Sequence, residues 1–131
     1  MRSNLKEILV GIIVAVLIIL FVQIFQEQFR LQLWVTTMTV ILSIYIGFAI
    51  KDGIAELLTI QIIGAAFFLA LTLLGLWNSV WFLVAAYFLH GLWDLLHDYK
   101  IIKTKVKSWY PDFCIVVDWI LGIWIAYNYL I

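Results

Sequence analysis

The chain has 131 residues, of which 66% are hydrophobic and 12% are charged, and its formal net charge is zero. Soluble domains carry about 25% charged residues, because polar side chains must cover most of their surface. The balanced charge also excludes the basic surface with which proteins bind nucleic acid, so we expect no nucleic-acid partner. The composition predicts a small integral membrane protein.

Five apolar stretches account for nearly the whole chain. Each approaches the ~20 residues that a helix needs to cross a hydrocarbon core of ~30 Å. A backbone in lipid must satisfy its own hydrogen bonds, and the alternating pattern of barrel strands is absent, so these stretches should be helices. The sequence predicts an all-α, polytopic bundle of five transmembrane helices in a single domain, 1–131, with helices at about 8–26, 31–50, 54–75, 77–97 and 112–131.

The basic residues predict the orientation of these helices. If the N-terminus is cytoplasmic, seven of the eight basic residues, Arg2 among them, lie on the cytoplasmic side and only Arg30 lies opposite. An excess of lysine and arginine is typical of cytoplasmic loops. We therefore expect a multi-pass protein of the inner (cytoplasmic) membrane with a cytoplasmic N-terminus. The lysines between 100 and 107 should contact anionic lipid headgroups.

Ionisable side chains gather near the end of the fourth stretch. A helix advances about 100° per residue, which brings one group of side chains into an arc of roughly 100°. Charged groups at membrane depth are costly, so they usually face the bundle interior and mark a site of function. The residues on this face are Tyr87, His90, Asp94, His97 and Asp98.

Asp118, in the fifth stretch, lies at a depth that matches this group. At about 1.5 Å per residue it is roughly 10 Å from the cytoplasmic edge, whereas His90 and Asp94 are roughly 12 and 6 Å from it. We expect the fourth and fifth helices to pack antiparallel, with Asp118 close to His90 or Asp94. Glu56 opens the third helix near the same edge.

The spacing of these residues favours a metal site. Positions i, i+4 and i+7 stack His90, Asp94 and His97 on one helical face, from which three ligands can approach one ion. A carboxylate and an imidazole at i and i+3 recur in metal sites of helical bundles, where other helices add carboxylates. The predicted ligands are His90, Asp94, His97 and Asp118, and the predicted catalytic groups are Glu56 and Asp118. Such ligands suit a divalent zinc, iron or manganese ion.

Two metal-free interpretations fit the same residues. A hydrogen-bonded network could transfer protons or bind a polar headgroup, or it could lock the fourth and fifth helices together. Asp98 and Asp112 should be solvated at the interface. Cys114 should be a small buried residue, with metal ligation or redox sensing as the alternatives. Tyr87 is either a membrane aromatic or a hydroxyl partner for the site.

A membrane-embedded, metal-dependent enzyme that hydrolyses or modifies a membrane lipid is our leading interpretation. A bound ion would activate water and polarise a carbonyl or phosphoryl oxygen. The alternatives are an ion or proton transporter or channel, formed as a homo-oligomer, and a structural subunit of a membrane assembly. The polar residues cluster at one end, so one monomer offers no continuous polar path.

The chain resembles an uncharacterised family of small bacterial integral membrane proteins. The resemblance rests on the pattern His-x-x-Trp-Asp-x-x-His at His90–His97, followed after a proline-containing loop by Cys-x-x-x-Asp at Cys114–Asp118. The segment Gly53–Glu56 is similar to the Gly-x-x-Glu that opens the third helix of that family. Asp98 departs from the pattern, in which a second histidine is common. The resemblance implies a bacterial membrane protein and an important polar site, without implying a reaction.

Overall fold

The computed structural model describes residues 5–130, which form five α-helices and no strand, and the structure is 86% helical. All five helices are long and apolar enough to cross a membrane, which confirms the predicted all-α class and indicates a multi-pass membrane protein. Arg2 and Ile131, used above for the orientation and for the end of the last helix, lie outside the described residues. The helices are α1 (Leu5–Gln23), α2 (Glu27–Asp52), α3 (Ala55–Trp77), α4 (Val80–Asp98) and α5 (Tyr110–Leu130).

The helix limits differ from the predicted ones where polar residues extend or cap a helix. α2 begins at Glu27, before its apolar run, because a helix can continue beyond the part that contacts lipid. α4 begins only at Val80, since the side chain of Ser79 caps it by accepting a hydrogen bond of 3.3 Å from the Trp81 main-chain N–H. A hydrophobic run therefore gives the apolar length of a helix and leaves its ends uncertain by a turn.

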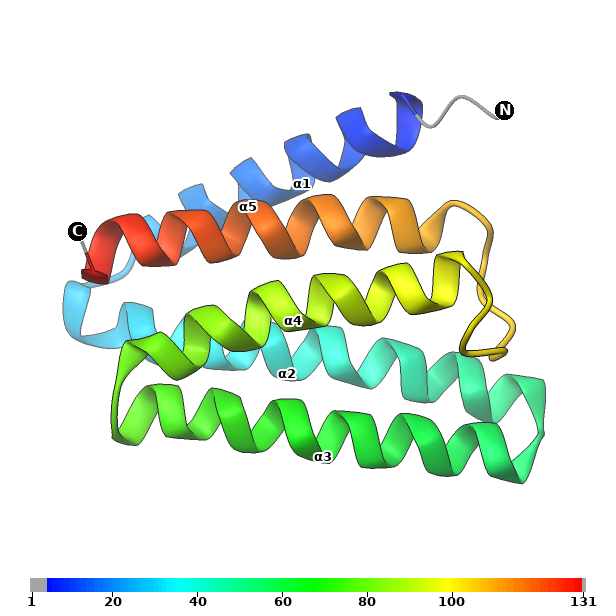
Figure 1. Cartoon of the computed structure of the whole chain (residues 1–131). Coiled ribbons are helices and arrows are strands. Elements are labelled where there is room, and N and C mark those ends of the chain that lie inside the picture. Colours follow the sequence, from blue (N-terminus) through cyan, green and yellow to red (C-terminus); the bar gives the residue numbers. More distant parts are fainter. Residues whose placement is uncertain (1–4, 131) are drawn as a thin grey trace.

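The helices lie side by side, and the 99–109 loop, the α2–α3 turn and the start of α1 share one end of the bundle, here called the loop end (Figure 1). α4 packs against α3 and α5, α2 packs against α3, and α1 packs mainly against α5. α1 makes few contacts with α2, although the two are consecutive. At the α2–α3 turn, Gly53 has a φ of 77°, a conformation that glycine adopts without steric cost.

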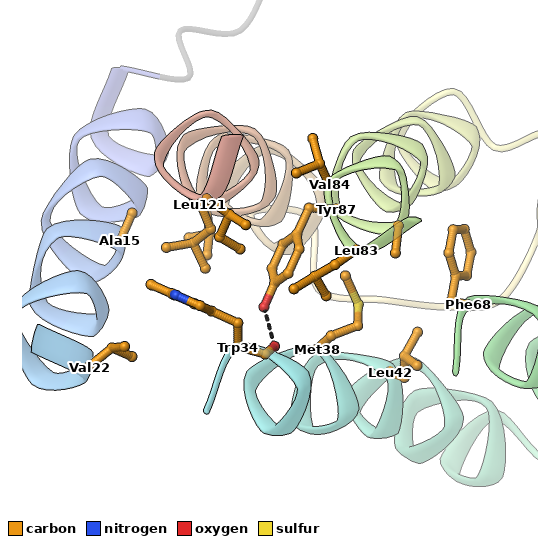
Figure 2. Packing of buried hydrophobic residues seen from close by; sticks show 13 residues of the cluster. Ala15, Val22, Trp34, Met38, Leu42, Phe68, Leu83, Val84, Tyr87 and Leu121 are labelled. Carbon is orange, nitrogen blue, oxygen red and sulfur yellow. Dashed lines mark hydrogen bonds between the residues drawn. The ribbon is translucent and has the colours of Figure 1, made fainter. Parts of the chain in front are cut away.

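An apolar core fills much of the half of the bundle that lies away from the loop end. Figure 2 shows how its side chains pack between the helices. The Tyr87 hydroxyl donates a hydrogen bond of 2.7 Å to the main-chain oxygen of Trp34, within this core. Tyr87 is therefore a core aromatic that links α4 to α2, and its hydroxyl is not part of the polar site. The largest side chains of the core include Trp34, Met38, Leu83, Tyr87 and Leu121.

The close packing of α4 on α5 yields a first prediction. A Cβ atom at Gly91 would overlap the indole of Trp119, which is held in place by a hydrogen bond of 3.1 Å to the Phe88 oxygen. Gly91→Ala should therefore lower stability by about 1–3 kcal/mol, the usual cost of overpacking. Thermal unfolding in detergent measures this loss. Gly47→Ala is the matched control, because the added Cβ has no atom within 4 Å among residues 5–130 other than those of the adjacent residues and its own helix backbone. An equal loss there would contradict the explanation.

Candidate metal centre

Four polar side chains from three helices meet inside the bundle, between its centre and the loop end. His90 and Asp94 come from α4, Asp118 comes from α5, and Tyr45 comes from α2. Each side chain is at most 1% exposed. Because burying ionisable groups is costly, these residues must stabilise one another or a bound group.

The geometry brings α4 and α5 together through His90. Its Nδ1 lies 2.8 Å from Asp118 Oδ2 and 3.8 Å from Asp94 Oδ2. One ligand atom from each of these three residues lies within 4.8 Å of the others. The prediction that α4 and α5 pack antiparallel, with Asp118 close to His90, is confirmed.

Two carboxylate oxygens of this group lack a hydrogen-bond partner. Asp94 Oδ1 accepts a hydrogen bond of 2.6 Å from the Tyr45 hydroxyl. Asp94 Oδ2 and Asp118 Oδ1 are buried, and neither has a hydrogen-bond partner among residues 5–130. A buried acceptor left in this way costs about 1–3 kcal/mol. A cation between the two carboxylates would remove that cost, and so would a proton shared by them.

Aromatic rings enclose the imidazole of His90. The ring centroid of Phe68, on α3, lies 4.9 Å from that of His90, and the centroid of Tyr45 lies 5.9 Å from it. These rings fix the imidazole plane and exclude water on two sides. Charge–charge interactions are stronger in such a dry environment than in water.

His97 is placed differently from its predicted role as a ligand, and it does not belong to the group of three ligand atoms. Its Nδ1 lies 2.8 Å from the Trp93 main-chain oxygen, and its Nε2 lies 2.6 Å from Gln61 Nε2. These partners assign the proton to Nδ1 and leave Nε2 as the acceptor of the Gln61 amide. The same amide donates a hydrogen bond of 3.1 Å to Thr104 Oγ1. His97 and Gln61 thus anchor the 99–109 loop to α3 and α4.

The other predicted residues lie outside the group. Glu56 is exposed in the first turn of α3, and Asp98 and Asp112 are partly exposed at the loop end. Cys114 is buried one turn before Asp118, among Tyr45, Tyr110 and neighbouring apolar residues, which confirms the expected small buried residue. Tyr45 could not be predicted as part of the centre, because a tyrosine in an apolar helix gives no signal of its hydrogen-bond partner.

The loop anchor yields a second prediction. Gln61→Leu removes both hydrogen bonds of the amide and leaves His97 Nε2 and Thr104 Oγ1, both buried, without this donor. Stability should fall by about 1–3 kcal/mol, and the 99–109 loop should open more often. Faster tryptic cleavage after Lys103 and Lys105 would report the opening. Gln32→Leu, on the exposed surface of α2, should leave the cleavage rate unchanged.

Comparison with known proteins places the chain in a family without assigning it an activity. No curated protein and no solved structure shows significant similarity to the chain. The model of a family of unknown function, DUF6010, matches residues 6–129, which is nearly the whole chain and includes every residue of the centre. The chain therefore belongs to DUF6010, a family of unknown function.

Proposed function

We propose that the protein is a membrane-embedded, metal-dependent enzyme that acts on a lipid, with the ion bound by His90, Asp94 and Asp118. The observation that carries the proposal is the pair of buried carboxylate oxygens without partners beside the His90 imidazole. The proposed ion is a divalent zinc, iron or manganese, because one imidazole and two carboxylates suit these metals.

The distances between the ligand atoms support this proposal. Ligand atoms at about 2.1 Å from a tetrahedral ion are separated from one another by about 3.4 Å. His90 Nδ1 lies 2.8 Å from Asp118 Oδ2 and 3.8 Å from Asp94 Oδ2, on either side of that value, and the ligand atoms of Asp94 and Asp118 lie within 4.8 Å of each other. If His90, Asp94 and Asp118 held such an ion, one position would remain for water or substrate, as in catalytic zinc sites. The Tyr45 hydroxyl would orient Asp94 from outside the ligand sphere.

The proposed reaction needs an activated water and a group that accepts a proton. A bound ion supplies a water that is nucleophilic near neutral pH and polarises a carbonyl or phosphoryl oxygen. Asp118 has one oxygen beside His90 and one without a partner, so it can bind the ion and also accept a proton. Glu56 is exposed on α3 and outside the group, so the proposal assigns it no catalytic role.

The 99–109 loop supports a lipid as substrate. A cavity of about 1000 Å³ in this loop is bordered by His97 and by several lysines. Each basic residue near a membrane surface attracts anionic lipid by about 1 kcal/mol. The loop is thus suited to hold an anionic headgroup at the end of the bundle nearest the centre. The lysines that line the cavity are Lys100, Lys103, Lys105 and Lys107.

A structural role is the alternative that a specific observation favours. The bond between His90 and Asp118 joins α4 to α5 without any ion and would hold the two helices together. A transporter or channel, even as a homo-oligomer, has less support, because the apolar core of Figure 2 blocks a polar path through the monomer.

Lipid turnover in vesicles tests the proposed activity. The purified protein is reconstituted in phosphatidylethanolamine and phosphatidylglycerol vesicles with zinc, iron or manganese in turn, and the lipids are then analysed by mass spectrometry. We expect a new lipid product that disappears when the ion is chelated and when Asp118 is replaced by asparagine. Binding of the ion without any lipid product in all three samples would contradict the enzyme and leave only a metal-binding protein.

We further propose an inner (cytoplasmic) membrane location with a cytoplasmic N-terminus, which follows from the basic residues at the loop end. The loop end carries Lys51 and the four lysines of the 99–109 loop, whereas Arg30 lies at the opposite end. A reporter that is active only outside the cytoplasm should therefore be active when it is fused after residue 131. An inactive fusion of this kind, together with an active fusion to a reporter that works only in the cytoplasm, would contradict the proposed orientation.

A further inference from the structure

A groove runs between α1, α2 and α5 and is separate from the loop cavity. Its volume is about 390 Å³, and apolar side chains form most of its wall. The two threonines on its α2 wall, Thr36 and Thr37, donate their hydroxyls to main-chain oxygens at 2.9 and 2.8 Å. Their hydrogen-bonding capacity is thus directed into the helix, and the wall remains apolar. Other wall residues are Val14, Ile18, Leu33, Val40, Ile41 and Ile44.

One part of this groove reaches the candidate metal centre. Asp118 lines it, together with Cys114 and Tyr110, on the α5 side. Asp118 is 1% exposed, and its Oδ1 has no hydrogen-bond partner among residues 5–130. The Tyr110 hydroxyl is likewise buried without a hydrogen-bond partner among residues 5–130. The groove therefore combines a long apolar wall with two buried polar groups on its α5 side, which is the arrangement of a site for an amphipathic ligand.

We propose that this groove binds one acyl chain of a membrane lipid and brings the functional group of that lipid to Asp118. The groove lies in the membrane-crossing part of the helices, where α1 and α2 make few contacts, so hydrocarbon surrounds its opening. Leu33 and Ile44 line it over about 16 Å of helix at roughly 1.5 Å per residue, a length that favours an extended chain.

The size of the groove favours an acyl chain over a second copy of the protein. A helix of a second copy is about 10 Å across, too wide to enter a groove with a volume of about 390 Å³ along about 16 Å of α2, so it could only lie across the opening. A single extended hydrocarbon chain is much thinner than a helix. The binding of an acyl chain depends only on the groove. The claim that this acyl chain belongs to the substrate rests on the proposed metal-dependent function.

Photocrosslinking in nanodiscs tests the groove. The discs contain phosphatidylcholine and a phosphatidylcholine with a diazirine in one acyl chain, and mass spectrometry locates the crosslinks. We expect crosslinks on Cys114 and Val117, which line the groove and are 6% and 5% exposed, so that lipid around the outer surface reaches them far less than it reaches Leu17 or Leu20. Crosslinks only on outward-facing residues such as Leu17 and Leu20 would overturn the proposal.

A groove-filling variant makes this test specific. Thr36→Trp places an indole in the groove and should lower α5 labelling about tenfold. This is the expected effect when about two methylene groups of the acyl chain lose their apolar contact with the groove. Val40→Trp is a second variant of the same wall, in case the first does not fold. Thr59→Trp is the control, because Thr59 is an exposed threonine on α3, outside the groove, with the same hydroxyl bond to its own helix. Equal α5 labelling in all three variants would overturn the proposal.

Metal analysis of the same nanodiscs separates the two proposals. If α5 is labelled but the discs retain no metal after incubation with zinc, iron or manganese, the groove is supported and the metal-dependent function is contradicted. Bound metal without labelled α5 overturns the groove and leaves the metal centre intact.

Discussion

His90→Ala is expected to abolish metal binding, whereas His97→Ala is expected to retain it. His90 supplies the only nitrogen among the three ligand atoms that meet within 4.8 Å, and His97 binds Gln61 and the Trp93 oxygen instead. Without His90, the buried carboxyl groups of Asp94 and Asp118 lose the imidazole nitrogen that lies 3.8 and 2.8 Å from them. Removing the partner of a buried hydrogen-bonding group typically lowers the free energy of unfolding by about 1–3 kcal/mol. Elemental analysis of protein purified without chelator measures the metal.

The comparison of the two histidine variants separates the metal centre from the loop anchor. Both variants should unfold at lower temperature than the wild type, because both histidines are buried and bonded. Only the wild type and His97→Ala should lose thermal stability when chelator is added, since an ion that binds only the folded state stabilises it. Loss of metal from His97→Ala and its retention in His90→Ala would contradict the assignment.

Tyr45→Phe is expected to weaken metal binding by about 10- to 100-fold, the usual effect of removing a group that orients a ligand. The Tyr45 hydroxyl donates its 2.6 Å hydrogen bond to Asp94 Oδ1, so its loss leaves Asp94 free to turn away from His90. Tyr87→Phe is the matched control, because Tyr87 is also fully buried and donates a 2.7 Å hydrogen bond, to Trp34 in the apolar core. Titration of metal-free protein with zinc gives both affinities.

The two tyrosine variants should have similar stabilities in the absence of metal. Each loses one buried hydrogen bond, which is worth about 1 kcal/mol. Their zinc affinities should differ, because only Tyr45 contacts the centre. Equal weakening in both variants would mean that the loss reflects general loosening of the bundle, and Tyr45 would then have no specific role.

The helices and part of the centre could be predicted from the sequence because both follow from simple geometry. Apolar length gave the number of helices, and helical rise gave the common depth of His90 and Asp118. His97 shares the helical face of His90, but it lies two turns nearer the loop end, where its neighbour is Gln61 on α3. The shared helical face therefore could not show that His90 contacts α5 whereas His97 contacts α3.

Tyr45 and the lipid groove show the limit of reasoning from periodicity. Tyr45 lies on α2 and meets Asp94 only after α2, α3 and α4 have packed together. The groove exists because α1 packs on α5 and contacts α2 sparsely, although α1 precedes α2 directly. Hydropathy describes each helix alone, and these features depend on which helices become neighbours.

X-ray absorption spectroscopy of the metal-loaded protein tests the central claim most directly. We predict one ion per chain, bound by a single imidazole nitrogen and by carboxylate oxygens at about 2.0–2.2 Å. A second imidazole would assign His97 to the ion, and a sulfur ligand at about 2.3 Å would assign Cys114. Either result would contradict the centre formed by His90, Asp94 and Asp118, and so would protein that binds none of zinc, iron or manganese.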